Sequence, residues 1–353
     1  MKRFPAEWEP QDAVLFAWPD VHTDWASQLN AVQQTYLAIF DALLNYSHVV
    51  LLVQASTALT LRKKLETQFG NHPYSIYLFK ADYNDTWARD FGPITVKNNH
   101  SPEVLNFGFD GWGGKFDATL DNTITSELVN KGVLSVPSYV VDLVLEGGGI
   151  ETDGNTTLLT TSRCLLNNNR NQNLSREDKK NHIEDSLRGT LGVKTILWLD
   201  HGYLAGDDTD SHIDTLARFS TKDTIVYVKC DEVKDEHFRE LSQMEAQLKT
   251  FTTEANEPFT LIPLPLPSAI FSTDGDRLPA TYANFLISNG VVLAPTYNDV
   301  ADKTALSQLK KAFPSYCVIG VDCRSLIEQR GSLHCISMQL LKNTVDFGRL
   351  DQI

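Results

Sequence analysis

The polar segment around His212 contains residue types that can carry out proton transfer. His212 and Asp214 are separated by one residue within the run 206–214. In an extended segment, side chains two residues apart share a face, so we expect His212 and Asp214 to project together with Ile213 buried behind them. A histidine held by a carboxylate can act as a general acid and base. A solvated acidic loop and the near half of an iron-binding facial triad are the alternatives that this stretch leaves open.

A second candidate cluster lies at residues 85–93, just before a Gly-Pro turn. Trp87 offers an aromatic face and Asp90 a carboxylate, the two features that recognise a guanidinium group. The alternative is a surface salt-bridge network, which contributes little to stability.

Glu146 precedes three consecutive glycines between two predicted strands. The glycines indicate that the backbone comes close to another strand or to a ligand. The segment lacks the Lys-Ser/Thr ending of a phosphate loop and the spacing of a dinucleotide fingerprint. Glu146 is therefore the more informative residue as a candidate.

Cys335 is the candidate nucleophile near the end of the chain. A thiol reacts once it is deprotonated, and a cationic substrate or a nearby imidazolium lowers its pKa. If 333–340 is a strand, His334 and Cys335 point to opposite faces, so a distant histidine must activate the thiol. The alternative is a small buried apolar residue. Cys317, Cys323, His334 and Cys335 lack the paired close spacing of a structural zinc site.

Short apolar runs that alternate with amphipathic stretches must position these residues. The runs that predict strands are 14–18, 49–53, 75–79, 93–96, 140–145, 149–151, 157–161, 195–199, 224–229, 283–287, 291–294, 317–321 and 333–340. Helical spacing covers 25–44, 59–69, 176–187, 237–248 and 305–312. Two strands, a helix and a strand recur, which predicts a repeated unit of roughly 70 residues if there are five. A plain α/β sheet is the alternative.

The stretch 252–282 holds five of the 14 prolines, so it cannot be a continuous helix or a central strand. We expect a long ordered loop there, and it is a candidate lid over an active site.

Composition limits the class of protein. The chain has 353 residues and a net charge of −14, which argues against nonspecific nucleic-acid binding and favours cationic small molecules. No apolar run approaches the roughly 20 residues of a membrane helix, and residues 1–8 contain an acid and a proline where a signal peptide is apolar. Five scattered cysteines do not form a disulfide pattern. We expect a cytoplasmic protein without membrane or nucleic-acid partners.

Taken in order, these motifs resemble the agmatine deiminase family, also called bacterial-type peptidylarginine deiminase-like proteins, among the guanidino-group-modifying enzymes. The likeness extends over nearly the whole chain, at 5–11, 17–19, 85–93, 111–116, 146–154, 165–171, 206–219, 282–285 and 331–337. It implies one catalytic domain over residues 1–353, an α/β fold in which ββαβ units form a five-bladed, pseudo-symmetric propeller (pentein). Family members are often dimers, so a homo-oligomer is expected.

The resemblance also implies roles for the candidate residues. The family's nucleophile falls on Cys335, its catalytic histidine on His212 and its guanidinium-binding acids on Asp90 and Asp214. Glu146 and Trp87 are further pocket residues. The implied reaction is hydrolysis of agmatine to N-carbamoylputrescine and ammonia through a covalent thiouronium adduct, with no metal or organic cofactor.

Departures from the family pattern at 329–333 and 337–339 leave the substrate open among agmatine, free arginine and peptidyl arginine. A substrate carboxylate would require an arginine partner, and Arg89, Arg277 and Arg330 all lie near motifs.

The sequence leaves two alternative functions open. One is a non-haem iron oxygenase that uses His212, Asp214 and a distal histidine, His237 or His334. The other is a family member that binds a guanidino or polyamine ligand without turning it over.

Overall fold

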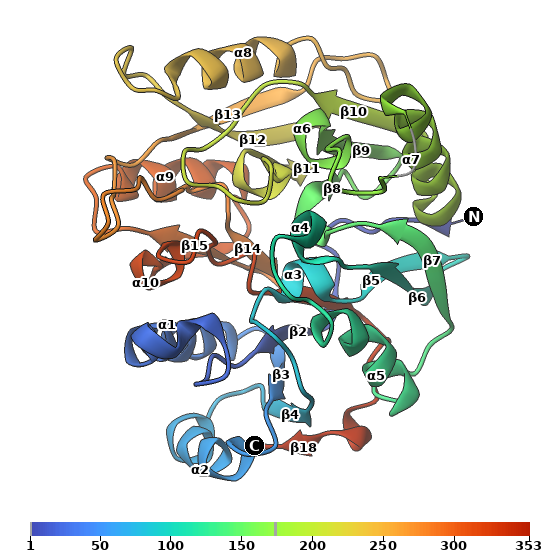
Figure 1. Cartoon of the computed structure of the whole chain (residues 1–353), viewed down its shortest axis with the longest axis vertical. Helices are drawn as coiled ribbons and strands as arrows, with labels where there is room; N and C mark the ends of the chain where they lie inside the picture. The colour runs from blue at the N-terminus through green and yellow to red at the C-terminus, as the bar shows by residue number, and fades with distance from the viewer. Residues whose placement is uncertain (1, 173–174) are drawn as a thin grey trace.

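The computed structural model describes residues 2–172 and 175–353, and in these residues the strands form five sheets (Figure 1). The largest has the order β17-β2-β3-β4-β18, in which β2, β3 and β4 are parallel and β17 is antiparallel to β2. Its strands are Gln11–Ala17 (β2), His48–Val53 (β3), Ile76–Lys80 (β4), Met338–Leu341 (β17) and Asp351–Gln352 (β18). Residues near both ends of the chain therefore share one sheet.

The other four sheets contain an antiparallel pair followed by a parallel strand. One contains β1 (Lys2–Arg3), β5 (Ile94–Asn98), β6 (Ser101–Gly108) and β7 (Ser138–Val144), and the next β8 (Ile150–Thr152), β9 (Thr157–Thr161) and β10 (Thr195–Leu199). The last two contain β11 (Ala217–Thr221), β12 (Thr224–Lys229) and β13 (Thr260–Pro265), then β14 (Leu286–Ser288), β15 (Val291–Thr296) and β16 (Cys317–Asp322).

Helices connect the antiparallel pair to the parallel strand and lie around the outside of the sheets (Figure 1). These are α1 (Leu29–Leu43), α5 (Ile124–Asn130), α7 (Arg176–Leu191), α8 (Phe238–Leu248) and α9 (Asp302–Ala312), and α2 (Ala58–Phe69) joins β3 to β4. Four short helices lie in connections: α3 (Ala88–Phe91), α4 (Gly111–Gly114), α6 (Ser162–Leu165) and α10 (Arg324–Ile327). The predicted recurrence of two strands, a helix and a strand is confirmed at the level of element order.

Local sequence explains several of these elements. Every residue of β2 is buried, as expected for an apolar strand covered on both faces. The Ser175 hydroxyl caps α7, and Gly192 ends it in the left-handed conformation, with φ 74°. The predicted helix over 25–44 begins later than expected, because Asp24–Gln28 forms a 3₁₀ turn before α1.

The proline-rich stretch 252–282 is not one long loop, because it contains β13. That strand lies at the edge of its sheet and pairs with β12, so Pro263 and Pro265 do not interrupt a central ladder. A cavity lies beside α3, and none of the described residues that line it comes from 252–282. The structure therefore gives no support to a lid role for this stretch.

The apolar side chains of these elements form one buried cluster that extends from Ala13 to Leu340. Among the described residues, no helix combines the length and the apolar character needed to cross a membrane. All five cysteines are free thiols, and Cys317 alone among them is exposed.

Candidate active site

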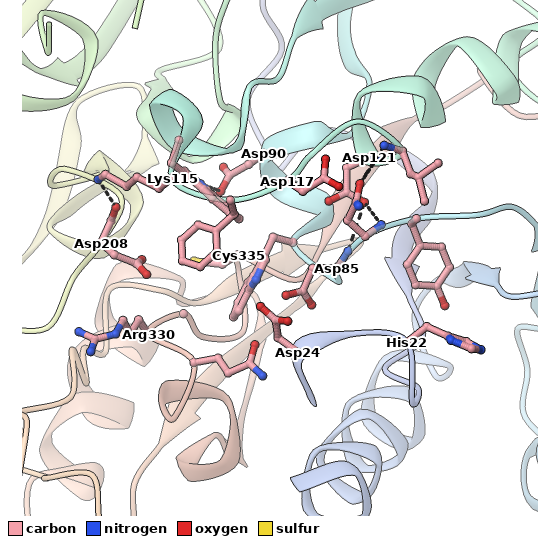
Figure 2. Close-up of a pocket in the computed structure, with 18 of the residues that line it drawn as sticks. His22, Asp24, Asp85, Asp90, Lys115, Asp117, Asp121, Asp208, Arg330 and Cys335 are labelled. Atoms are coloured by element: carbon pink, nitrogen blue, oxygen red, sulfur yellow. Dashed lines mark hydrogen bonds between the residues drawn. The ribbon is translucent and has the colours of Figure 1, made fainter. Parts of the chain in front are cut away.

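A cavity of about 1180 Å³ lies beside the short helix α3 and the segment that precedes β17. Figure 2 shows Asp90 and Cys335 near the middle of its lining, between Lys115, Asp208 and Arg330 on one side and Asp24, Asp85 and Asp121 on the other. Its acidic residues are Asp24, Asp82, Asp85, Asp90, Asp117, Asp121, Asp208 and Glu328.

The described lining contains one lysine, Lys115, and one arginine, Arg330. Both side chains donate hydrogen bonds to the protein. Lys115 Nζ donates to the Asp208 carbonyl at 2.5 Å and to Asp210, and Arg330 donates to the Gly206 carbonyl at 3.0 Å. Burial raises the pKa of Asp85 and of Asp121 to about 7. A cation bound nearby lowers these pKa values, so the two side chains lose their protons and become carboxylates beside it. The cavity therefore suits a cationic ligand.

Asp90 is held at the floor of the cavity by two donors. The Gly148 N–H donates to Oδ1 at 2.9 Å, and Trp112 Nε1 donates to Oδ2 at 3.0 Å. Burial, together with the nearby Asp214 and Glu146, raises the pKa of Asp90 well above its ordinary value. The carboxyl group is thus fixed in place and ready to lose a proton when a cation arrives.

His212 and Asp214 do not lie in an extended segment, so that expectation is wrong. Ile213–Thr215 forms a 3₁₀ turn with His212 at its cap, because the Thr215 hydroxyl and N–H both return to the His212 carbonyl. Both side chains nevertheless reach Asp90. A Cβ built on Gly148 would lie 2.6 Å from His212 Nδ1, 2.9 Å from Asp90 Oδ1 and 3.1 Å from Asp214 Oδ2. The glycine is required because these three groups converge on it.

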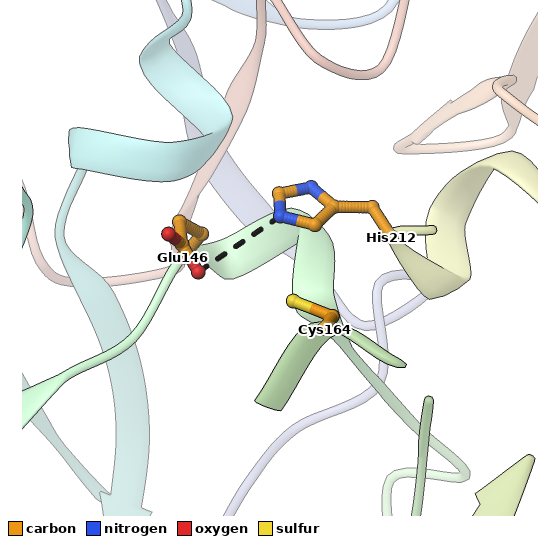
Figure 3. A group of neighbouring side chains, drawn as sticks. All are labelled: Glu146, Cys164 and His212. Atoms are coloured by element: carbon orange, nitrogen blue, oxygen red, sulfur yellow. Dashed lines mark ion pairs between the residues drawn. The ribbon is translucent and has the colours of Figure 1, made fainter. Parts of the chain in front are cut away.

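His212 is fully buried and unusually free of hydrogen bonds. Neither ring nitrogen has a partner, with Nδ1 3.7 Å from Asp90 Oδ1 and Nε2 3.9 Å from Glu146 Oε2 (Figure 3). Burial lowers the pKa of His212 to about 3, which leaves the imidazole neutral at pH 7. A neutral ring with open nitrogens can accept a proton during a reaction.

Glu146 faces His212 with one oxygen and an arginine with the other. Arg170 Nε donates to Glu146 Oε1 at 2.7 Å, while Oε2 has no partner. Burial raises the pKa of Glu146 and the Arg170 charge opposes that rise. Glu146 Oε2 therefore lies beside the His212 ring without a hydrogen bond to it.

Cys335 lies in a turn over 333–336 and not in a strand, because β17 begins only at Met338. The apolar residues that predicted the strand are buried in this turn. Asn284 Nδ2 lies 3.2 Å from Cys335 Sγ, and Asp214 Oδ2 lies 3.7 Å away. Burial, then Asp214 and Asp90, raise the pKa of the Cys335 thiol well above its ordinary value. Cys335 is a thiol in this structure and needs a nearby positive charge to ionise.

Trp87 lines the cavity beside the thiol segment, and its ring packs directly on Gly331. A Cβ on Gly331 would lie 2.1 Å from Trp87 Cζ3. The turn before Cys335 therefore fixes the position of the aromatic ring.

Two arrangements of residues could hold a metal ion, the predicted iron triad and a group around Glu146. Both ring nitrogens of His334 are in hydrogen bonds, with Asp214 and Glu7, and both of His237 are in hydrogen bonds, with Asp235 and the Ala205 N–H. Neither of these distal histidines in the iron hypothesis therefore has a nitrogen free for a metal. The structure does not assemble that triad. Among the described residues, Glu146, Cys164 and His212 offer ligand atoms within 4.8 Å of one another (Figure 3). The Arg170 charge on Glu146 opposes a cation there.

Sequence reasoning missed several residues that build this site. Trp112, Arg170 and Asn284 lie in motifs that contributed to the family likeness, yet no role could be assigned to them. Their contacts with Asp90, Glu146 and Cys335 join segments 22 to 51 residues apart. A single sequence carries no signal for such pairings.

Comparisons with known proteins identify the family. The family model for the Porphyromonas-type peptidyl-arginine deiminase matches residues 3–340. The agmatine deiminase of Pseudomonas syringae pv. syringae is 32% identical over 360 residues, covering 95% of this chain and 94% of that protein. The chain belongs to the Porphyromonas-type peptidyl-arginine deiminase family.

Two solved structures are also similar. A cysteine-to-serine variant of C. jejuni agmatine deiminase with substrate bound has a TM-score of 0.87 and 36% identity, covering 97% of each chain. A Porphyromonas gingivalis protein, crystallised under the provisional name of an arginine deiminase, has a TM-score of 0.89 and 43% identity, covering 98% of this chain and 100% of that one.

Proposed function

We propose that this protein is an agmatine deiminase, a hydrolase that converts agmatine and water into N-carbamoylputrescine and ammonia. The observation that carries the proposal is the convergence of His212, Asp90 and Asp214 on the Gly148 backbone, with the Cys335 thiol 3.7 Å from Asp214. A thiol, an imidazole and two carboxylates around one small space suit a planar guanidinium group. The C. jejuni relative, an agmatine deiminase with bound substrate, supports the same substrate class.

The guanidinium group would lie between Asp90 and Asp214, with its carbon facing Cys335. Asp214 Oδ1 is buried without a partner and is available to accept an N–H from the substrate. The positive charge opposes the effects that raise the pKa values of Asp90 and Cys335. Substrate binding thereby favours the thiolate, which is the nucleophile.

The bonds and protons balance with His212 as the shuttle. The thiol proton passes to His212, the Cys335 thiolate bonds to the guanidinium carbon, and the imidazolium returns the proton to a departing NH₂ group, which leaves as ammonia. The thiouronium adduct remains. Neutral His212 then takes a proton from water as its oxygen attacks the adduct carbon. The C–S bond breaks, the proton that remains on the ureido oxygen passes to solvent or to the released ammonia, and the neutral ureido product leaves. His212 returns its own proton to sulfur.

The charge of the cavity favours agmatine over arginine. The tail of agmatine is an ammonium group, which the acidic side chains of the cavity other than Asp90 would attract, whereas the carboxylate of arginine would meet repulsion. Arg89 and Arg277 are paired with Glu7 and Asp235 and do not line the cavity.

Free or peptidyl arginine is the second candidate, because Arg330 lies in the lining and the P. gingivalis relative is provisionally named an arginine deiminase. A protein that binds a guanidino compound without turnover is the remaining alternative.

We also propose that residues 1–353 act as one catalytic domain, with the five sheets as blades of a pseudo-symmetric propeller around the site. The recurrence of the same strand and helix order supports this. Five unpaired cysteines support the proposal of a cytoplasmic location.

The test is a colorimetric assay for ureido product with agmatine, free arginine and a blocked arginine peptide in parallel, with Cys335→Ala as the control. We expect product from agmatine that depends on Cys335. Product from arginine or the peptide instead would keep the reaction type and overturn the substrate. No product from any of the three would contradict the proposed function.

A further inference from the structure

His334 lies between the buried Asp214 carboxylate and the partly buried Glu7 carboxylate, and it contacts the Asp214 oxygen other than the unpaired one. Its Nδ1 is 2.7 Å from Asp214 Oδ2, and its Nε2 is 2.7 Å from Glu7 Oε1. The His334 side chain is only 1% exposed and that of Asp214 is fully buried. The residue therefore joins the amino-terminal segment to a carboxylate that lies against Cys335 in the cavity lining.

These two contacts limit where protons can lie among Asp214, His334 and Glu7. An N···O distance of 2.7 Å needs a hydrogen between the atoms, so the two contacts together need two protons shared among Asp214, His334 and Glu7. Burial and the charges of Arg218 and Arg89 lower the pKa of His334, and its hydrogen-bonded carboxylates oppose that effect. His334 can donate to Asp214 through Nδ1 only while its ring keeps this orientation.

Glu7 is well placed to keep the ring in that orientation. Its carboxylate accepts from Arg89 Nη1 at 3.1 Å and from Arg218 Nη2. Arg218 is fully buried in β11 and also bonds Glu151 and two backbone carbonyls. Two charge-assisted contacts from rigid elements leave the Glu7 carboxylate little freedom.

We propose that His334 is a positioning residue that fixes the Asp214 carboxylate, and that Glu7 anchors His334 for this task. With Oδ2 held by His334, Asp214 presents Oδ1 to the substrate. Oδ2, the oxygen that His334 holds, lies 3.7 Å from Cys335 Sγ, so the placement of the Asp214 carboxylate affects both the guanidinium group and the nucleophile. The inference rests on the proposed guanidinium binding by Asp214.

The test compares His334→Asn with His334→Leu, which have side chains of similar size. Both lose the contact with Glu7, but the asparagine amide can replace Nδ1–H as a donor to Asp214, whereas leucine cannot. We expect kcat/KM for agmatine to fall about 10-fold or less in the asparagine variant and at least about 100-fold in the leucine variant. Thermal melts of the two variants provide the control for folding.

Binding separates this inference from the proposed reaction. In the Cys335→Ala background, calorimetry with agmatine reports the guanidinium site without turnover, and we expect His334→Asn to bind at least about 10-fold more tightly than His334→Leu. Equal affinities and equal kcat/KM values of the two variants would overturn the role of His334. Absence of ureido product with the affinity difference intact would count against the reaction and leave the positioning role standing.

Glu7→Gln tests the anchor. If Glu7 acts through His334, Glu7→Gln lowers kcat/KM in the wild-type background and has no further effect in the His334→Leu background. Equal effects in both backgrounds would show that Glu7 acts independently of His334 and would overturn its role as the anchor.

Discussion

Two buried polar regions meet at Asp214, and they differ in how completely their hydrogen bonds are satisfied. On the side of His212 and Asp90, both nitrogens of His212, Glu146 Oε2 and Asp214 Oδ1 have no hydrogen-bond partner. On the opposite side, Glu7, Arg89, Arg218 and His334 form a continuous set of hydrogen bonds. The side chains of both regions are buried except for Glu7, which is partly buried, so the contrast is mainly one of pairing.

The difference indicates what each region does. A buried polar atom without a partner lowers stability by roughly 1–3 kcal/mol, and such atoms gather where a ligand can complete them. A fully paired network of charges holds its members in one arrangement. We infer that the open side receives the guanidinium group and that the paired side fixes the geometry. Substitutions on the two sides should therefore differ in whether they affect turnover or stability.

The largest expected effect on turnover is that of His212→Gln. Glutamine cannot carry the proton between the thiol, the leaving nitrogen and water, so kcat should fall by about 10²–10⁴-fold. Because His212 makes no hydrogen bonds through its ring, the melting temperature should change little. Steady-state kinetics and a thermal melt measure both, and a rate within 10-fold of wild type would contradict the role. Accumulation of the thiouronium adduct in mass spectra would assign His212 mainly to the water step.

On the paired side, Arg218→Met should affect stability. Methionine removes the paired cation from the buried Glu151 carboxylate and one of the two arginines from the partly buried Glu7, so the free energy of unfolding should fall by about 3–5 kcal/mol. The matched control is Arg324→Met, which removes an arginine from an exposed pair with Asp322 and should cost less than about 1 kcal/mol. Urea unfolding of both variants tests this, and equal losses would contradict the account.

The open side should also release protons when it binds a cation. Burial, Asp214 and Glu146 raise the pKa of Asp90 well above its ordinary value, which favours the protonated carboxyl group in the protein without a bound cation. A bound guanidinium favours the carboxylate, and the affinity of Cys335→Ala for agmatine should rise with pH, by at most about tenfold per unit, until Asp90 is ionised in the free protein. Calorimetry in buffers with different ionisation enthalpies detects the released proton. Proton uptake, or affinity that falls with pH, would contradict the assignment.

A smaller effect is expected from Gly331→Ala. The new methyl group would displace the Trp87 ring from the cavity wall without removing any reacting group. We expect KM for agmatine to rise about 3- to 10-fold with kcat within about twofold of wild type. The control is Gly290→Ser, at a site where an added Cβ meets open space, although its φ of 93° adds backbone strain. A loss of kcat in Gly331→Ala would show that the glycine positions Cys335 more than it positions Trp87.

The sequence predicted the fold elements better than the contacts of the site. The strand expected at 195–199 has those bounds in β10, because an apolar run between polar segments is a local pattern. The sequence predicts a strand where Cys335 lies in a turn. Leu333 and Ile336 are buried in the turn as they would be in a strand, so their apolar character does not distinguish the two. The 3₁₀ turn at Ile213–Thr215 likewise has no periodic signal.

The residue types in the motifs indicate which side chains could react, but they do not indicate which side chains contact each other. His212, Asp90, Asp214, Glu146 and Cys335 stood out as polar or reactive groups in motifs. The roles of Glu7 and Arg218 depend on a contact across 211 residues, and nothing in a single sequence indicates which arginine meets which acid. Long-range packing of the five sheets sets these pairs.

The most direct test of the account is a crystal structure of the Cys335→Ala protein with agmatine bound. The account predicts that guanidinium N–H groups donate to Asp214 Oδ1 and to Asp90 at about 3 Å. It also predicts that the Asp214–His334–Glu7 contacts are unchanged and that the ammonium tail points into the acidic cavity. A guanidinium group bound elsewhere, with Asp214 Oδ1 still unpaired, would contradict the central claim.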